Sequence, residues 1–221
     1  MVLSGKLARV AAAIVIPAAA FLVAIGPASA ATDGGGAKGS LTCLLASSFT
    51  FTPPLSPGIG TTGVTQEVVT MGPAVLSGCT GSITVGSLPV SGTQTKATTI
   101  KIKALKHLPG GGKAAGGCPA FLGLNWPKFK PKYGWTTGAT PDAKTKASVA
   151  KGGTWGADGS LFTLTFSGTA RGSFAGSVAI NAVFDSASSD AFHTCIGGSP
   201  GTISSAEFDS SLSTITFTPP A

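Results

Sequence analysis

Apolar and polar residues alternate with a period of two in several short stretches of this chain. Phe162, Leu164 and Phe166 alternate with threonine and serine, and Ile100 and Ile102 alternate with lysine. The same pattern recurs near residues 49–52, 178–184 and 214–218. A period of two is typical of β-strands that are buried on one face. We therefore expect strands whose Phe and Ile side chains face a core and whose Thr and Lys side chains face water.

Segments rich in Gly and Pro separate these stretches, at residues 53–63, 108–117, 156–160 and 196–201. Residues 166–176 are typical of a hairpin that turns near residues 170–172. Many short strands joined by short turns predict an all-β, antiparallel fold, either a barrel or a sandwich. No helical period is sustained after the N-terminal segment. The one short helix that we expect covers residues 118–125, with Pro119 in its first turn.

Two similar octapeptides, "SSFTFTPP" at residues 47–54 and "STITFTPP" at residues 213–220, stand near opposite ends of the chain. Thr-Phe-Thr suits a pleated sheet with one wet face. The two prolines remove two backbone donors, which prevents further ladder pairing. Because the flanking sequences differ, we interpret the copies as two separate strands ended by the same device, not as a duplicated domain.

The first 30 residues have the pattern of a secretory signal peptide. Lys6 and Arg9 precede an apolar stretch from Val10 to Ile25, and Ala28-Ser29-Ala30 forms a cleavage signal. An uncleaved anchor is the alternative. Residues 31–40 are predicted to be a flexible leader, and residues 41–221 a single antiparallel β domain, long enough to bury a substantial core. We expect a protein that is secreted or associated with the cell envelope.

Four cysteines follow the signal peptide: Cys43, Cys79, Cys118 and Cys195. An exported chain with four cysteines is expected to form two disulfides. If residues 41–52 and 68–80 form a hairpin, one register sets Cys43 opposite Cys79 and Phe51 opposite Met71, with Val69, Met71, Val75 and Cys79 on the core face. This register predicts the pair Cys43–Cys79 and leaves Cys118–Cys195.

Positive charge is concentrated in the middle of the chain. The formal net charge is +7, or +5 without Lys6 and Arg9, and no acid lies between Glu67 and Asp142. This interval holds eight lysines: Lys96, Lys101, Lys103, Lys106, Lys113, Lys128, Lys130 and Lys132. One region of the molecule should therefore carry a positive field.

The segment "NWPKFKPKYGW", residues 125–135, interleaves lysines with aromatic residues. Aromatic faces can stack on sugars or bases, and lysines attract anionic groups. The candidate binding residues are Trp126, Lys128, Phe129, Lys130, Lys132, Tyr133 and Trp135. An anionic envelope polymer is the expected partner, or else a small apolar ligand of the β domain; nucleic acid fits the charge but not an exported protein. The alternative interpretation is that the aromatic residues pack on the core and the lysines are simply solvated.

Catalytic motifs are not found, so we expect no enzyme, no cofactor and no metal site. His193 and Cys195 are two residues apart, which in a strand does not orient a catalytic dyad, and a disulfide would consume the sulfur. Four acids could in principle serve a hydrolase, although they stand in turn-rich segments where capping or solvation is the simpler role: Asp185, Asp190, Glu207 and Asp209.

Cys43, "SFTFTPPLSPG", "SGCTG" around Cys79, "YGWTT" and "FSGTARGSFAG" follow one another along the chain. This arrangement resembles a loose group of uncharacterised secreted all-β proteins of high-GC Gram-positive bacteria. The resemblance implies export and a β-rich domain, but no activity and no site residues.

The sequence leads us to expect a non-catalytic secreted or envelope-associated β protein that binds an anionic polymer or a small apolar ligand. The alternative is a small membrane-embedded, porin-like β-barrel with its apolar face outward. A secreted hydrolase is the third hypothesis.

Overall fold

The computed structural model describes residues 38–58, 60–85, 88–103, 106–107, 113–122, 126–137 and 140–220. The predicted signal peptide and residues 31–37 of the predicted leader lie outside the described residues. Lys38, Gly39 and Ser40 were expected in the flexible leader, but they belong to strand β1 (Lys38–Ala46) and pair with β5 (Val75–Val85). The β1–β5 ladder extends this far because glycines at positive φ, Gly39 and Gly81, allow the two backbones to approach closely.

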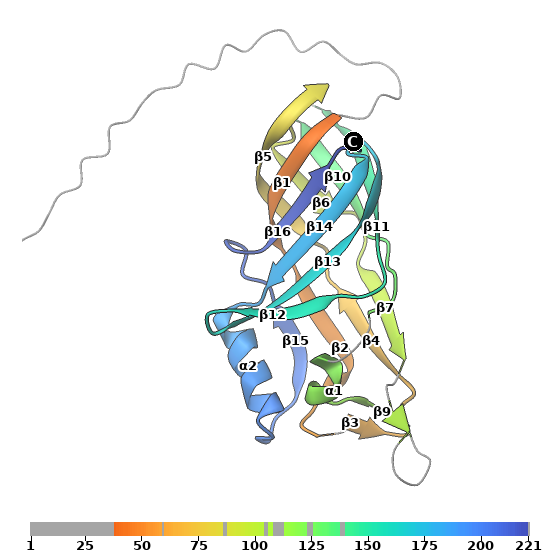
Figure 1. Cartoon of the computed structure of the whole chain (residues 1–221), viewed down its shortest axis with the longest axis vertical. Coiled ribbons are helices and arrows are strands. Elements are labelled where there is room, and N and C mark those ends of the chain that lie inside the picture. Colours follow the sequence, from red (N-terminus) through yellow and green to blue (C-terminus); the bar gives the residue numbers. More distant parts are fainter. Residues whose placement is uncertain are drawn as a thin grey trace, which may run out of the picture. The chain divides into compact units, whose positions relative to one another are not determined.

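Eight antiparallel strands close into a β-barrel (Figure 1), which confirms the predicted all-β class and selects the barrel over the sandwich. Their order is β11-β10-β6-β5-β1-β16-β14-β13, and pairing of β13 with β11 closes the ring. Besides β1 and β5, these strands are β6 (Ser91–Gln94), β10 (Lys132–Thr137), β11 (Thr140–Val149), β13 (Leu161–Gly172), β14 (Gly176–Val183) and β16 (Thr214–Thr218). Strand β12 (Thr154–Asp158) pairs with the same edge of β13 as β11, but near its opposite end.

Four barrel strands are continued by the strands of a second sheet. Its order is β15-β2-β4-β7, formed by β15 (Ile203–Glu207), β2 (Ser48–Leu55), β4 (Gln66–Met71) and β7 (Thr98–Lys103). The barrel neighbours β16, β1, β5 and β6 follow or precede these strands along the chain in the same spatial order. A third sheet is small and joins β3 (Gly60–Thr62), β9 (Lys113–Gly116) and β8 (Lys106–His107).

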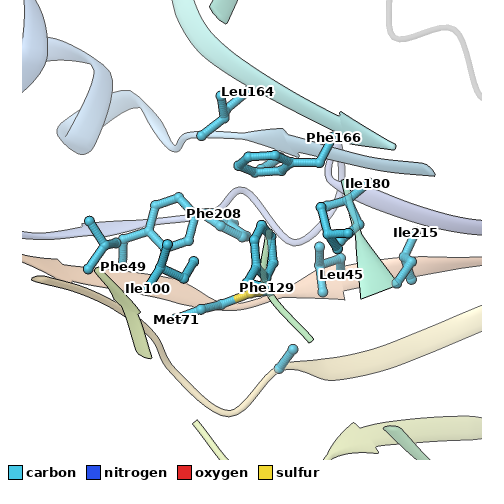
Figure 2. Packing of buried hydrophobic residues seen from close by; sticks show 14 of the residues in the cluster. Leu45, Phe49, Met71, Ile100, Phe129, Leu164, Phe166, Ile180, Phe208 and Ile215 are labelled. Atoms are coloured by element: carbon cyan, nitrogen blue, oxygen red, sulfur yellow. The ribbon is translucent and has the colours of Figure 1, made fainter. Parts of the chain in front are cut away.

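The hydrophobic core lies on the inward face of the barrel and of the second sheet. On β1, Leu41, Cys43 and Leu45 are buried while the residues between them are partly exposed. On β14, Val178, Ile180 and Ala182 are buried in the same way, as the period of two predicts. Figure 2 shows Leu45, Ile180 and Phe129 close together in this core, with Phe49 and Phe208 beside them.

The outward positions of the barrel carry mainly small polar side chains. On β16, Thr214, Thr216 and Thr218 alternate with buried Ile215 and Phe217, and the hydroxyls of Thr42 and Thr216 lie 3.0 Å apart across the β1–β16 ladder. A membrane-embedded barrel needs the reverse arrangement, with apolar side chains outward. The burial pattern therefore favours the interpretation in which Thr and Lys face water.

The two prolines end pairing differently in the two octapeptides. Strand β16 stops at Thr218, just before Pro219 and Pro220, as expected. Strand β2, however, runs through Pro53 and Pro54 to Leu55. Its ladder to β4 does end at Thr52, because the prolines offer no donor, whereas its ladder to β15 resumes at Leu55 after an irregularity. The two octapeptides are therefore separate strands, as predicted. Only in the second octapeptide do the two prolines end the strand.

Both predicted disulfides, Cys43–Cys79 and Cys118–Cys195, are present. The proposed register was wrong in one part: Met71 lies opposite Phe49, not opposite Phe51. A bulge causes half of this shift, because the β1–β5 ladder steps from Thr42 opposite Thr80 to Leu44 opposite Ser77. The other half arises between the two ladders, where the three residues 72–74 stand against the two residues 47–48.

The same hairpin also changes face between β4 and β5. Val75 was expected on the core face with Met71, yet it is 51 % exposed and its neighbour Leu76 is buried. Residues 72–74 leave the sheet between the two strands, so the period of two does not carry across them.

A second helix is a clear departure from expectation, since only one short helix was predicted. The predicted one, α1 (Cys118–Leu122), is present within the described residues, and α2 (Ser186–Ile196) follows β14. Asp185 is the N-cap of α2, and its carboxylate accepts a hydrogen bond of 2.7 Å from the Ser188 amide. The predicted hairpin at residues 166–176 is confirmed, but its turn lies at residues 173–175, because β13 continues to Gly172.

Candidate binding face

The aromatic side chains of residues 125–135 do not form an exposed surface. Contrary to the expectation of a contact surface, Trp126, Phe129, Tyr133 and Trp135 are each at most 4 % exposed, so their rings are not available for stacking on a ligand at the surface. The ring centroid of Trp126 lies 5.2 Å from that of Phe166 and 5.4 Å from that of Phe49. These rings supply the core of the molecule, which is the alternative interpretation given above.

The barrel interior beside β10 is filled by the other two rings of the segment. Trp135 lies 5.0 Å from Phe174 and 5.5 Å from Phe217, measured between ring centroids, and Tyr133 lies 6.1 Å from Phe217. Thr145 anchors this cluster, because its hydroxyl oxygen accepts hydrogen bonds from the Trp135 indole N–H at 2.8 Å and from the Phe174 amide at 3.2 Å. These packed side chains belong to the hydrophobic core of the barrel.

Alternation along the segment places its lysines on the other side. Phe129 and Val149 form a β-bridge, and β10 continues the pairing with β11 from Lys132. Lys128, Lys130 and Lys132 are therefore exposed while the residues between them are buried. The sequence predicted these three lysines as binding residues, and the structure keeps them available on the outer wall of the barrel.

Register brings three further cations beside these lysines. Lys132 lies opposite Lys146 in the β10–β11 ladder, and Lys146 lies opposite Arg171 in the β11–β13 ladder. Directly opposed side chains of antiparallel strands have Cβ atoms about 5 Å apart. The resulting surface, here called the cationic face, consists of exposed residues from β10, β11, β13 and the segment before β10: Lys128, Lys130, Lys132, Lys144, Lys146 and Arg171.

Opposed like charges destabilise a sheet unless counter-charges compensate them. The acids with described side chains lie on other elements: Glu67 on β4, Asp158 on β12, Asp185 and Asp190 at α2, Glu207 on β15, and Asp209 after β15. Asp142 also lies on β11, but its side chain is outside the described part of the structure. The row of Lys132, Lys146 and Arg171 brings three positive charges together, which by itself is unfavourable for the sheet.

The lysines of β7 have a simpler role. Lys101 and Lys103 are exposed on β7, which is an edge strand of the second sheet. Charged side chains on an edge strand oppose pairing with another chain. Edge protection accounts for these two residues, so we do not count them in the binding face.

Two buried titratable groups lie away from the cationic face. Glu67 points inward with Val69 on β4, is 2 % exposed, and makes no side-chain hydrogen bond with another described residue. Burial raises the pKa of Glu67 from 4.5 to about 7, and the nearby Thr52 amide lowers it only in part. Burial likewise raises the pKa of Tyr133, whose hydroxyl has no partner among the described residues.

Two of the four acids considered for a hydrolase accept local hydrogen bonds that serve the fold. Asp185 caps α2, and Asp209 accepts hydrogen bonds from the Ser211 amide and hydroxyl, which lower the pKa of Asp209. Asp190 and Glu207 are exposed. A hollow of about 430 Å³ on β13, β14 and β16 and one of about 130 Å³ beside Cys195 are lined by none of these four carboxylates.

His193 and Cys195 were expected to lie on the same strand. Both residues lie on α2, not on a strand, and the Cys195 sulfur is bonded to Cys118. The His193 ring packs 4.6 Å from Phe162, between centroids, and its Nε2 lies 3.1 Å from the Ser160 carbonyl oxygen. Within the described part of the chain, no group of three or more His, Cys, Asp or Glu side chains could hold a metal ion.

Lys144, Lys146 and Arg171 are the residues of the cationic face that the sequence did not single out. Lys144 and Lys146 flank the buried Thr145, so their alternation was a usable signal for exposed positions. Their position beside Lys132 and Arg171 depends on the β10–β11 and β11–β13 registers, which join distant segments.

None of the described helices is both long enough and apolar enough to span a membrane. Comparisons with protein-family models, curated proteins and solved structures returned no match. The function must therefore be argued from the geometry of this chain alone.

Proposed function

We propose that this chain is a non-catalytic binding protein that acts outside the cell or in the cell envelope, where it holds an anionic polymer on the cationic face. The observation that carries the proposal is the cross-strand row of Lys132, Lys146 and Arg171. Three cations held about 5 Å apart on a rigid barrel wall can contact successive anionic groups of a polymer without ordering a loop.

The location is supported by two independent features. The first 30 residues have the pattern of a secretory signal peptide. All four cysteines are joined in disulfides, Cys43–Cys79 and Cys118–Cys195, which persist in oxidising compartments. A secreted or envelope protein meets anionic polymers of the cell surface as its most abundant charged partners.

The proposal is tested by measuring the affinity for poly-L-glutamate at several salt concentrations. The triple variant Lys132→Gln/Lys146→Gln/Arg171→Gln should bind at least about tenfold more weakly at low salt. Its plot of log affinity against log salt should be shallower by about 2, because three ionic contacts are lost.

The control is Lys101→Gln/Lys103→Gln, which removes two charges from exposed positions of β7 in the second sheet. This control should keep most of the affinity. If the two variants lose affinity in proportion to the charge that each removes, net charge alone drives binding and the cationic face is not a site. If the wild-type chain does not bind poly-L-glutamate at low salt, the proposed function is wrong.

A further inference from the structure

A hollow of about 430 Å³ with a mixed polar and apolar lining lies on the outer wall of the barrel, on the side where β12 separates from the barrel. Residues from four strands line it, among them Thr154, Thr165, Ser167, Asn181, Thr214 and Thr216. Its volume is within the range of small-molecule sites in proteins.

Strand register arranges these side chains as a regular grid. One row runs across the sheet from Thr165 on β13 to Asn181 on β14 and Thr214 on β16, each directly opposite the next. A parallel row, two residues further along each strand, contains Ser167, Ala179 and Thr216. The grid faces outward, because the alternate residues Phe166, Ile180 and Ile215 are buried.

The lining of the hollow contains hydroxyl and amide groups but no charged side chain. Asn181, Thr214 and Thr216 are half-buried, and in the described part of the chain no hydrogen bond engages the Asn181 amide. The Thr165 hydroxyl donates to the Thr154 carbonyl oxygen at 3.3 Å, and the Thr216 hydroxyl lies 3.0 Å from that of Thr42. The Asn181 amide and the Thr214 hydroxyl can each donate to a ligand and accept from it. Such a surface complements a neutral molecule rich in hydroxyl groups, and offers a charged group no counter-charge.

The hollow and the cationic face share strand β13. Ser167 and Arg171 both point outward from β13 and are four residues apart, which corresponds to about 13 Å along the strand. A single extended polymer can therefore reach the hollow and the row of Lys132, Lys146 and Arg171 together.

We infer that the hollow is a saccharide subsite, and that the anionic polymer of the proposed function is a glycan whose neutral sugar unit occupies the hollow while its acidic groups contact the cationic face. This inference rests on the proposed function for the acidic groups, but the sugar contact in the hollow stands on its own geometry.

Two variants matched in chemistry test the subsite. Thr165→Val/Thr214→Val removes two hydroxyls from the hollow, and Thr93→Val/Thr136→Val removes two from exposed positions of β6 and β10. The probes are hyaluronate oligomers, which alternate acidic and neutral sugars, and poly-L-glutamate, which has charge but no sugar. The hollow variant should bind hyaluronate about five- to twentyfold more weakly, with its affinity for poly-L-glutamate unchanged. The control variant should match the wild-type chain with both probes.

The outcomes separate the two proposals. An equal loss with both probes in the hollow variant, or no loss with hyaluronate, would overturn the saccharide subsite and leave the proposed function standing. A titration with maltohexaose, monitored by NMR, tests the hollow with a sugar that carries no charge. Shifts centred on Thr165, Asn181 and Thr216 are expected even if poly-L-glutamate fails to bind, and shifts elsewhere or none would sink the subsite.

Discussion

Lys146 lies directly opposite Arg171 in the β11–β13 ladder, so two cations are adjacent on the outer wall of the barrel. Opposed like charges weaken a strand pair by roughly 0.2–1 kcal/mol. Arg171→Gln should therefore raise the free energy of unfolding by about this amount at low salt. The gain should shrink at high salt, because exposed charges are screened.

Urea denaturation at low and high salt measures this effect without adding a charged denaturant. Arg171→Lys keeps the charge and is the control, so it should give no salt-dependent gain. A loss of stability in Arg171→Gln at low salt would mean that packing of the long arginine stem outweighs repulsion. If Arg171→Gln is more stable and also binds poly-L-glutamate more weakly, the charge of Arg171 favours binding and opposes folding.

Thr145 holds the aromatic cluster inside the barrel, and its removal gives the second prediction. Thr145→Val keeps the side-chain shape but leaves the Trp135 indole N–H and the Phe174 amide without their acceptor. Each unsatisfied buried donor costs about 1–3 kcal/mol. We expect a loss of about 2–4 kcal/mol in the free energy of unfolding, measured by denaturation followed through tryptophan fluorescence.

Ser148→Ala on the same strand is the control, since Ser148 is half-buried on the outward face. It should change the stability by less than about 0.5 kcal/mol. Equal stability of Thr145→Val and the wild-type chain would show that water reaches the two donors, which contradicts their burial.

The period of two identified most of the fold, because it is a local signal. It placed Phe166, Ile180 and Phe217 on the core face and Lys101 and Lys103 on the wet face. It could not identify α2, because half of the buried positions of that helix are serines. Ser188 and Ser189 are buried, and their hydroxyl oxygens accept hydrogen bonds from the backbone amides of Glu207 and Phe162. These contacts with distant strands replace the apolar stripe that would mark a helix in the sequence.

The candidate site was predictable only in part for a related reason. The lysines before β10 stand together in the sequence, whereas Arg171 joins them only when β13 pairs with β11 and closes the barrel. The grid of Thr165, Asn181 and Thr214 likewise depends on two ladders between segments far apart in the chain. Spacing within one strand says nothing about which distant strand lies beside it.

The third prediction concerns the order in which the disulfides are reduced. Cys79 is partly exposed, whereas Cys118 is fully buried and Cys195 is 2 % exposed. Because exchange requires access of a thiolate to a sulfur, mild reductant should open Cys43–Cys79 first in the native protein. Differential alkylation and mass spectrometry over time measure the order. In denaturant the two bonds should open at similar rates, and earlier opening of Cys118–Cys195 in the native protein would contradict this burial.

Glu67 gives the fourth prediction, a pH dependence opposite to that of most acids. Its pKa is about 7 in the folded chain and 4.5 in its ordinary state, so the folded state binds more protons between these values. Stability contributed by this site is therefore present below pH 4.5 and is lost as the pH rises through 7. The loss should be about 1–3 kcal/mol, because one pKa unit corresponds to about 1.4 kcal/mol.

Glu67→Gln removes the titration while keeping the shape, so the free energy of unfolding of the wild-type chain minus that of the variant should fall as the pH rises from about 4.5 to 7. Urea denaturation at a series of pH values measures this difference. Gln66→Asn, at the exposed neighbour of Glu67 on β4, is the control: it leaves every titratable group in place, so its difference from the wild-type chain should not depend on pH. A flat difference for Glu67→Gln would mean that the Glu67 carboxyl loses its proton at the same pH in the folded and the unfolded chain. It would then have to be solvated or paired, contrary to its inward position beside Val69.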